Sequence, residues 1–327
     1  MLIDNHNRKI NYLRLAVTDR CNLRCNYCMP SEGIDFAEKD KLFTIDELTT
    51  VSRILVEQGI DKLRITGGEP FVRKDLMDLL RRLSKMEGLK DISITTNATL
   101  IGPHINELKR IGITNVNVSL DAIDKATFER ITRRDQYETV YGNLIRLIAE
   151  GFNVRINFIV LENQNIQDIF PILEVMKNYD VSVRFLEEMP FNGGSKKFNT
   201  INWNYKRILE HIKSQYPDIE EISSPKTSTS INYKIKGHMG TFGLIPSFSR
   251  TFCGSCNRLR ISATGDVITC LYAKPCANLR DILRGENAEE AVKQQILKAV
   301  GSRAETGFEA QAKYAKVFEN SMTSIGG

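Results

Sequence analysis

The sequence CNLRCNYC at residues 21–28 decides how the rest of the chain is interpreted, because it places three cysteines within eight residues. It follows an alternating apolar run at residues 12–17, which predicts a β-strand. A four-iron cluster normally takes four thiolates, so three clustered cysteines predict a cluster with one iron left open for a small molecule. The alternatives are three structural thiols or a zinc knuckle. Zinc needs a fourth nearby ligand, and the next cysteine is Cys253.

The C-x3-C-x2-C spacing of Cys21, Cys25 and Cys28 resembles the cluster motif of the radical S-adenosylmethionine (SAM) enzymes. Tyr27 matches the aromatic residue that this superfamily places before the last cysteine, near the adenine of SAM. The resemblance implies that the amino and carboxylate groups of SAM chelate the open iron. It also implies that one electron from the cluster cleaves SAM to a 5′-deoxyadenosyl radical.

Length and composition predict one large folded domain, or a domain with an extension. The chain has 327 residues, of which 42% are hydrophobic and 26% charged. Its net charge of +5 fits an anionic small substrate and does not require nucleic acid. No apolar run could span a bilayer, and residues 1–10 show no signal-peptide pattern. Seven cysteines without an export signal indicate a reducing compartment, so we expect a cytoplasmic protein.

Strand-like and helix-like patterns alternate from residue 12 to about residue 190. The predicted strands are residues 12–17, 62–66, 91–95, 115–120, 153–160 and 181–186. The predicted helices are residues 45–58, 75–85, 103–111, 125–131 with 140–150, and 166–177. Six such units predict parallel strands with right-handed crossovers. Because eight would close a full barrel, six predict an α/β fold with an incomplete (βα)6, TIM-like barrel over residues 1–190.

Unusual polar residues follow the predicted strands, where the chemistry of parallel α/β sheets gathers. The cysteine sequence follows the first strand. Later strand ends carry TGGEP at residues 66–70, TTN at 95–97, SLD at 119–121 and EEMP at 187–190. These segments are expected to meet at one mouth of the barrel.

Residues 191–327 break this alternation and are predicted to form an extension that covers the open side of the barrel. A C-x2-C motif at residues 253–256 is followed there by Cys270 and Cys276. A zinc ribbon with all four thiols is one interpretation. The other is a second iron–sulfur cluster on the first three, with Cys276 as a fourth ligand or a bystander. The NRLR segment at residues 257–260 places two arginines on one side of a strand, as expected of an anion or nucleotide site.

Four features in this order resemble the GTP 3′,8-cyclase family of molybdenum cofactor biosynthesis. They are the first cysteine motif, GGEP at residues 67–70, FCGSCNRLR at residues 252–260 with Cys270 after it, and the glycine pair at residues 326–327. The resemblance covers nearly the whole chain. The first motif alone is common to a superfamily, whereas the ordered set is specific to this family.

The resemblance implies a ligand set for two [4Fe-4S] clusters, for SAM and for GTP. The first cluster takes Cys21, Cys25 and Cys28, and the second takes Cys253, Cys256 and Cys270. The expected SAM contacts are Tyr27, Gly67, Gly68, Glu69, Ser119 and Met189. The expected GTP contacts are Arg14, Arg64, Thr95, Arg155, Arg184, Arg258, Leu259 and Arg260. The residues expected to take part in catalysis are Arg258, Arg260, Gly326 and Gly327.

The same resemblance implies a reaction and partners. The SAM-derived radical removes the C3′ hydrogen of GTP, and C3′ then bonds to guanine C8. The product is 3′,8-cyclo-7,8-dihydroguanosine 5′-triphosphate, so the expected enzyme is a SAM-dependent lyase. The expected partners are a reductase or a flavodoxin- or ferredoxin-type electron donor, and the downstream cyclic pyranopterin monophosphate synthase. A homodimer is also expected. Neither nucleic acid nor a membrane is expected as a partner.

The residue chemistry agrees with a triphosphate ligand, because guanidinium groups bind phosphate bidentately and the sequence has no P-loop motif. Two positions depart from the family pattern. Arg155 replaces a usual lysine, which keeps the charge but changes the geometry, and Ala98 replaces a usual glycine. The glycine pair at residues 326–327 is expected to thread into the active-site mouth, because glycine without a Cβ can approach a ligand closely.

Two other functions stay open. A radical SAM peptide maturase with an auxiliary cluster would also carry C-terminal cysteines, although the NRLR segment and the glycine pair are not expected there. A zinc-ribbon protein that binds nucleic acid would show a basic face with exposed aromatic side chains. The single tryptophan, Trp203, and the modest net charge do not indicate such a face.

Overall fold

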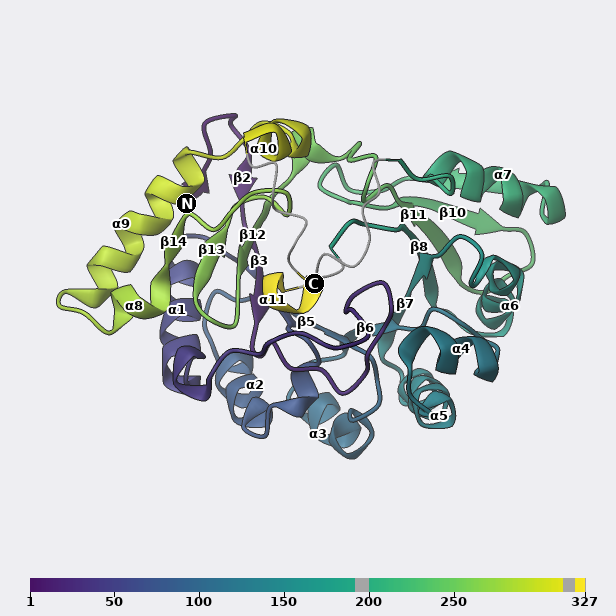
Figure 1. Cartoon of the computed structure of the whole chain (residues 1–327), viewed down its shortest axis with the longest axis horizontal. Coiled ribbons are helices and arrows are strands. Elements are labelled where there is room, and N and C mark those ends of the chain that lie inside the picture. Colours follow the sequence, from purple (N-terminus) through teal and green to yellow (C-terminus); the bar gives the residue numbers. More distant parts are fainter. Residues whose placement is uncertain (192–199, 314–320, 327) are drawn as a thin grey trace.

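A computed structural model of the chain describes residues 1–191, 200–313 and 321–326. Its main feature is a twelve-stranded sheet. Figure 1 shows this sheet curving around the short helix α11 (Met322–Ile325), with most of the other helices on its outer side. A separate N-terminal hairpin pairs β1 (Leu2–Ile3) with β2 (Lys9–Ile10) in antiparallel fashion.

Six consecutive parallel strands form the middle of the sheet. They are β3 (Tyr12–Ala16), β4 (Lys62–Thr66), β5 (Asp91–Thr96), β6 (Asn115–Ser119), β7 (Asn153–Val160) and β8 (Ser182–Glu187). Each strand end lies within one residue of its predicted position. On β3 the fully buried Leu13 and Leu15 alternate with Tyr12 and Arg14, as the period of two requires. The predicted parallel α/β sheet is confirmed.

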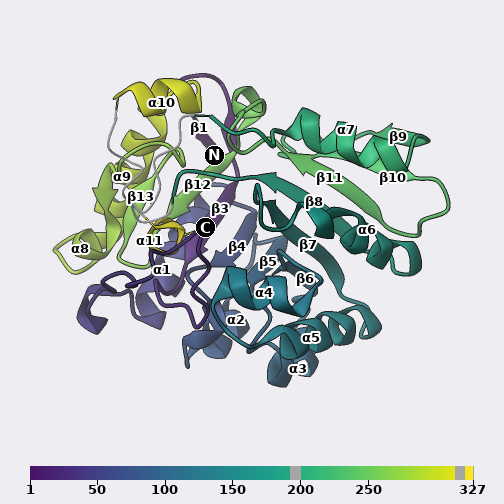
Figure 2. The same cartoon turned by 45° about the vertical axis from the view of Figure 1, so that its right-hand side comes forward.

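Helices cover the outer side of these strands (Figure 2). They are α1 (Ile45–Glu57), α2 (Leu76–Ser84), α3 (Ile105–Arg110), α4 (Lys125–Thr132), α5 (Tyr137–Ala149) and α6 (Ile169–Asn178). Short 3-10 helices are η1 (Lys39–Lys41), η2 (Pro70–Val72), η3 (Gly102–His104), η4 (Ile166–Asp168) and η5 (Cys253–Ser255). A capping box begins α1: the Thr44 side chain accepts from the Glu47 N–H at 3.2 Å, and Glu47 Oε2 accepts from the Thr44 N–H at 2.7 Å.

The rest of the chain adds strands to both edges of the six-stranded core. Its elements are α7 (Tyr205–Gln215), β9 (Ile219–Ile222), β10 (Ile231–Ile235), β11 (Thr241–Ile245), β12 (Arg258–Ile261), β13 (Asp266–Ile268), β14 (Ala277–Asn278), α8 (Leu279–Leu283), α9 (Ala288–Gly301) and α10 (Gly307–Lys313). The full order is β14-β13-β12-β3-β4-β5-β6-β7-β8-β11-β10-β9. Strand β12 runs parallel to β3, and β11 runs parallel to β8. Both edges of the core are therefore paired.

Residues 279–301 form two helices, α8 and α9, with a turn between them. The turn between them contains Gly285 and the left-handed Asn287, which has a φ of 49°. Glycine and asparagine are the residues that most readily adopt such non-helical conformations, so the helix ends at this turn.

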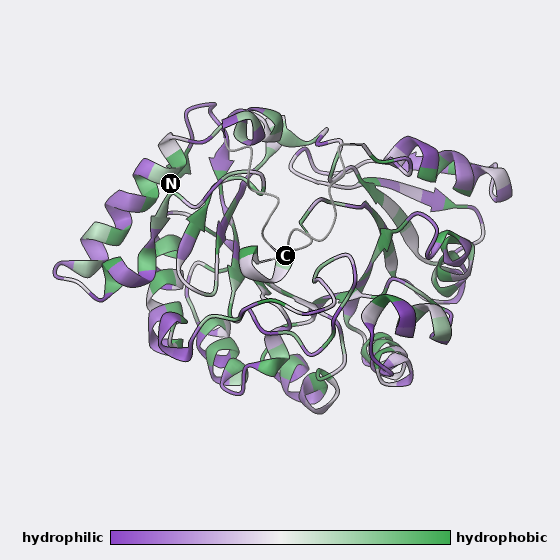
Figure 3. Ribbon diagram, viewed as in Figure 1, coloured by the Kyte–Doolittle hydropathy of each residue, from purple (hydrophilic) through white to green (hydrophobic). Residues whose placement is uncertain are grey.

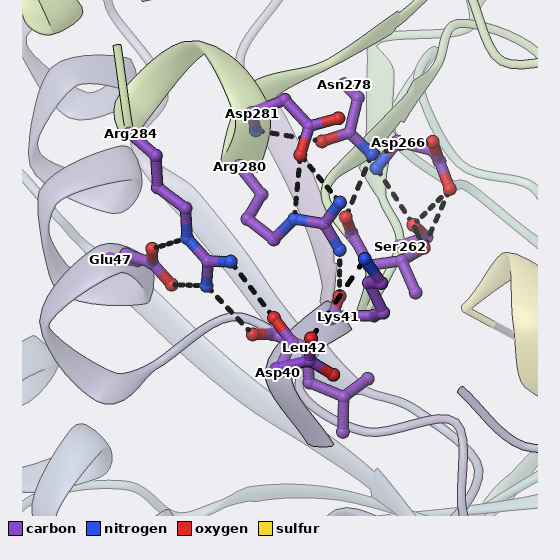
Figure 4. Close-up of polar contacts among 11 residues, drawn as sticks. Asp40, Lys41, Leu42, Glu47, Ser262, Asp266, Asn278, Arg280, Asp281 and Arg284 are labelled. Atoms are coloured by element: carbon purple, nitrogen blue, oxygen red, sulfur yellow. Dashed lines mark hydrogen bonds and ion pairs between the residues drawn. The ribbon is translucent and has the colours of Figure 1, made fainter. Parts of the chain in front are cut away.

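Arginines fasten α8 to the first helical layer (Figure 4). Arg284 Nε donates to Glu47 Oε1 at 2.6 Å, and the same guanidinium reaches the carbonyl of Asp40 at 3.0 Å. Arg280 donates to the carbonyl of Lys41 and forms an ion pair with Asp281. These contacts join residues far apart in the sequence, so the C-terminal part is attached along the outside of α1.

The main hydrophobic core lies between the sheet and its helices, whose apolar sides Figure 3 shows turned inward. A second, smaller apolar cluster lies on the other side of the sheet and combines Phe191, Ile268, Tyr272, Ala310 and Ile325. It holds α10 and α11 in place. Within the described residues, every helix is too short or too polar to cross a bilayer.

Candidate active site

Six of the seven cysteines line one cavity of about 330 Å³. Residues 21–28 follow the carboxyl end of β3, whereas Cys253 and Cys256 precede β12, which runs parallel to β3. The two groups therefore lie toward opposite ends of neighbouring strands. At a rise of about 3.3 Å per residue, the five residues of β3 correspond to roughly 16 Å. The space between the two groups suits an elongated ligand.

The seventh cysteine, Cys276, does not belong to this cavity. Its side chain is exposed, and its Sγ donates a hydrogen bond to the carbonyl of Val267. Within the described residues, no three His, Cys, Asp or Glu side chains converge on a single metal ion. A four-iron cluster needs a wider cradle than one ion, because each thiolate binds a different iron.

Helix α4 and a buried carboxylate fix the first cysteine loop. The Arg24 and Asn26 N–H groups donate to the carbonyls of Thr132 and Ile131, each at 2.9 Å. The Tyr27 hydroxyl donates to Asp121 Oδ2 at 2.7 Å. Tyr27 therefore has a fixed orientation at the cavity wall.

Polar groups also reach the sulfur atoms of this loop. Asn97 Nδ2 lies 3.7 Å from Cys21 Sγ, and Ser321 Oγ lies 3.6 Å from Cys28 Sγ. Burial raises the pKa of Cys21 to about 12 and raises the pKa of Cys25 well above its usual range. Thiolates at these positions thus need a positively charged centre to stabilise them.

The GGEP segment lies directly against this loop. The N–H groups of Gly68 and Glu69 donate to the carbonyls of Thr18 and Arg20, both at 2.8 Å. Gly67 and Gly68 line the cavity. Glu69 does not line it: its side chain is fully buried, and its oxygens accept from the Phe71 and Asn97 N–H groups and from the Thr96 hydroxyl. Burial raises the pKa of Glu69 to about 7. Its expected contact with the SAM amino group stays a prediction.

Replacing Gly68 with alanine is expected to lower the free energy of unfolding by about 1–3 kcal/mol, as overpacking typically does. A Cβ at this position would overlap the carbonyl oxygen of Arg20, which is backbone and cannot turn away. Gly254→Ala is the matched control, because a Cβ there meets open space within the second cysteine motif. Denaturant unfolding of both variants tests this, and equal midpoints would contradict it.

Between the cysteine groups, the cavity wall carries five arginines: Arg14, Arg64, Arg184, Arg258 and Arg260. Arg260 pairs in register with Arg14, and Arg14 with Arg64, across three adjacent strands. Burial, and then the charge of Arg258, lowers the pKa of Arg260 to about 10. Burial, and then the charges of Arg155 and Arg64, lowers the pKa of Arg184 to about 9.

Several donors of this arginine set have no acceptor. Arg184 Nε and Arg258 Nε and NH2 are buried and have no hydrogen-bond partner within residues 1–191, 200–313 and 321–326. Leaving buried charged donors unpaired is costly, so the wall is arranged for an anion.

The other expected contacts divide into two groups. Thr95, Ser119 and Met189 line the cavity. Arg155 and Leu259 do not: Arg155 is half-buried on β7, and the fully buried Leu259 side chain belongs to the main core. Leu259 alternates with its two arginine neighbours and therefore points to the other side of β12. The assigned contacts of Arg155 and Leu259 with GTP stay predictions.

The C-terminal segment reaches the inner side of the sheet, where Figures 1 and 2 show α11 beside β3. Met322 and Thr323 line the cavity. Arg260 NH1 donates to the carbonyl of Gly326 at 2.8 Å in a buried contact. Gly326 has a φ of 72°, and a Cβ there would lie 3.1 Å from the Cβ of Ala16. Gly327 lies outside the described residues.

Comparison with known proteins identifies relatives over nearly the whole chain. A "Radical SAM superfamily" model matches residues 15–176, and a "Molybdenum Cofactor Synthesis C" model matches residues 181–308. The chain is 38% identical to the "GTP 3',8-cyclase" of Peptoclostridium acidaminophilum over 90% of this chain and 91% of that protein. It is 35% identical to the mitochondrial "GTP 3',8-cyclase" of Arabidopsis thaliana over 100% of this chain and 84% of that protein. The chain belongs to the GTP 3′,8-cyclase family.

Longer relatives share the family. "Molybdenum cofactor biosynthesis protein 1" of Homo sapiens is 37% identical over 92% of this chain and 48% of the human protein. The chain thus spans about half the length of such curated relatives. Among solved structures, Streptococcus suis SuiB has a TM-score of 0.62 at 14% identity, over 88% of this chain and 69% of that chain. This likeness shows a common fold.

Membership of the GTP 3′,8-cyclase family confirms the resemblance found in the motifs. The radical SAM match implies one [4Fe-4S] cluster and SAM. The residues present fit that cluster, since three half-buried cysteines line the cavity and polar groups approach two of their sulfur atoms. When bound, the cluster and SAM would supply the electron and the radical.

Sequence reasoning missed two other residues that line the cavity, Tyr12 and Arg250. Tyr12 lines the cavity two residues before Arg14, with its hydroxyl buried among cationic side chains, and the period of two could have identified it. Arg250 lines the cavity too, with its guanidinium carbon 3.8 Å from the ring centroid of Tyr272. Arg250 has a φ of 54°, and no local sequence pattern predicts its place at the cavity wall.

Proposed function

We propose that this protein is a SAM-dependent lyase that converts GTP to 3′,8-cyclo-7,8-dihydroguanosine 5′-triphosphate, the first step of molybdenum cofactor biosynthesis. One observation carries the proposal: two groups of three cysteines line a single cavity, with a wall of half-buried and buried arginines between them. One cysteine group suits radical generation, and the arginines suit a triphosphate. The names of the relatives support the same activity.

A second [4Fe-4S] cluster on Cys253, Cys256 and Cys270 is part of the proposal. Three observations support it. These three cysteines line the cavity, whereas Cys276, which a four-thiol zinc ribbon would require, is exposed elsewhere. Burial raises the pKa of Cys256, but the charges of Arg258 and Arg303 outweigh it and lower the pKa to about 7. The surroundings therefore favour a thiolate at this position.

Each side chain then has a defined task. We assign SAM to Tyr27, Gly67, Gly68, Glu69, Ser119 and Met189 at the first cysteine group. We assign GTP to Arg14, Arg64, Thr95, Arg155, Arg184, Arg258, Leu259 and Arg260. The arginines hold the triphosphate, and the buried walls exclude water from the ribose. Gly326 and Gly327 close the cavity beside Arg260, which the 2.8 Å contact between Arg260 NH1 and the Gly326 carbonyl supports.

The proposal also covers the architecture, which we interpret as a partial barrel with a C-terminal extension. Strands β3 to β8 and their helices would form an incomplete (βα)6 barrel over residues 1–190, and residues 191–327 would form the cluster- and GTP-binding extension. The pairing of β12 with β3 and of β11 with β8 supports an extension that continues the barrel at both open edges. The electron donor, the downstream synthase, the homodimer and the cytoplasmic location stay predictions.

Anaerobic incubation of the iron-loaded protein with SAM, dithionite and GTP tests the proposed reaction. The nucleotide loses one hydrogen atom and gains one electron and one proton, so the product is an isomer of GTP. We expect 5′-deoxyadenosine together with a nucleotide of unchanged mass, altered retention time and altered fragmentation. A parallel incubation contains a peptide in place of GTP. Release of 5′-deoxyadenosine without a new nucleotide, together with modification of that peptide, would favour a peptide maturase.

Metal content tests the two clusters separately. The anaerobically loaded protein is expected to hold about eight irons per chain, four for each cluster. Replacing Cys253, Cys256 and Cys270 with alanine should leave about four, and Cys276→Ala should leave all eight. Iron and zinc analysis measures both. One zinc per chain in place of the second set of irons would contradict the second cluster.

A further inference from the structure

One arginine of the N-terminal hairpin connects three distant segments behind the second cysteine group. Arg8 Nε donates to Asp4 Oδ2 at 2.7 Å within the hairpin. Its NH1 donates to the carbonyl of Cys253 at 2.9 Å and to that of Glu305 at 2.6 Å, while NH2 donates to the carbonyl of Ala304 at 2.9 Å. All three nitrogens of Arg8 are therefore used to join the hairpin, the cysteine loop and the segment that follows α9.

The segment at residues 303–307 in turn contacts two cysteine sulfurs. Arg303 NH2 donates to Cys256 Sγ at 3.3 Å, and the Gly307 N–H donates to Cys253 Sγ at 3.3 Å. Arg303 is buried but does not line the cavity. It approaches Cys256 from behind the cavity wall, so it is not placed to touch the nucleotide.

The charges of this network do not cancel. The Asp4 carboxylate lies between two guanidiniums, 2.7 Å from Arg8 Nε and 3.7 Å from Arg303 Nε. The exposed fractions of the three side chains are 0% for Asp4, 7% for Arg8 and 3% for Arg303. Arg303 NH1 has no hydrogen-bond partner in the described part of the chain. One positive charge is thus left buried beside a sulfur atom, and burying it is costly unless a negative group offsets it.

We propose that Asp4, Arg8 and Arg303 are positioning residues of the second iron–sulfur cluster, and that the Arg303 guanidinium raises its reduction potential. The inference rests on the second cluster of the proposed function. Net charge and hydrogen bonds to sulfur set the potential of such clusters. A nearby positive charge stabilises the reduced form more than the oxidised form, because reduction adds a negative charge. Asp4 and Arg8 hold the guanidinium and residues 303–307 in place.

The test uses the full-length chain with Cys21, Cys25 and Cys28 replaced by alanine, so that the second cluster gives the only cluster signal. Its midpoint potential is measured by redox titration followed by electron paramagnetic resonance. Arg303→Gln is expected to shift the potential to a more negative value. Arg303→Lys is expected to keep the potential close to that of the parent, because lysine keeps the charge. Arg284→Gln is the control: it removes an arginine ion pair on the outer side of α1, and the potential should stay unchanged.

Arg8→Lys separates positioning from charge. Lysine keeps the positive charge but cannot bond Asp4, Cys253, Ala304 and Glu305 together. Iron loss to an added chelator is therefore expected to be several-fold faster than in the parent, with little change in potential. Circular dichroism before and after chelation checks that each variant is folded.

The outcomes distinguish the second cluster itself from the roles of Arg303 and Arg8. A parent chain that takes up zinc or no iron overturns the second cluster and this inference with it. A parent with four irons whose potential is the same with Arg303→Gln overturns the charge effect alone. Unchanged iron loss in Arg8→Lys overturns the role of the hairpin.

Discussion

Arg258→Ala is expected to weaken GTP binding at least about 30-fold, because truncating one member of a buried charge pair costs about 2–5 kcal/mol. Buried Nε and NH2 donors of Arg258 find no acceptor in the described residues, so a triphosphate would supply their first bonds. SAM cleavage without GTP turnover should continue, because the first cysteine group lies at the other end of β3. Isothermal titration with GTP and quantification of 5′-deoxyadenosine measure the two effects.

The same variant should behave differently without ligand. Removing one of several neighbouring guanidiniums relieves like-charge repulsion, so the melting temperature without GTP is expected to stay equal or rise, while the GTP-induced increase shrinks. Arg81→Ala is the control, since Arg81 pairs with Glu107 on the outer helices and should leave GTP affinity unchanged. Iron analysis confirms that both clusters are loaded. Unaltered GTP affinity in Arg258→Ala would remove it from the binding site.

Deleting residues 326–327 is expected to abolish cyclisation while iron content and SAM cleavage remain. The Gly326 carbonyl accepts from the buried Arg260, so the deletion leaves a cavity arginine without that bond and free to adopt another orientation. Product analysis after anaerobic turnover measures the loss. Ser324→Ala is the control, because among the described residues its hydroxyl donates to the carbonyl of Ser321, the N-cap residue of α11. Full turnover by the truncated protein would exclude the glycine pair from the mechanism.

The sequence predicted the parts of the fold that repeat locally. Strand-like runs between helical patterns located all six core strands, and the rule that chemistry gathers at strand ends predicted Gly68 and Ser119, which line the cavity. Alternation also places Leu259 away from its arginine neighbours, so the assignment of Leu259 to the ligand came from the family pattern and not from the strand. The positions of strands, and the side to which each residue points, were predicted reliably because they follow from the geometry of the strand itself.

Contacts made across the chain could not be predicted in this way. Asp4 and Arg303 are 299 positions apart, and neither stands in a motif. Glu69 is a motif residue, yet the structure turns its carboxylate to three internal donors, because the loop after β5 comes to lie against it. Such contacts depend on how segments far apart in the sequence pack against each other in the folded protein. Local sequence patterns carry no information on this packing.

The pairing of β12 with β3 has a consequence for synthesis of the protein. Strand β3 emerges from the ribosome early, but its neighbour β12 follows some 240 residues later. At translation rates of about 5–20 residues per second, the edge of β3 stays open for roughly 12–50 s. Unpaired edges recruit other strands, so a nascent chain is exposed to misassembly during this interval. Chaperones that shield the growing polypeptide would therefore benefit this protein most before residue 258 is made.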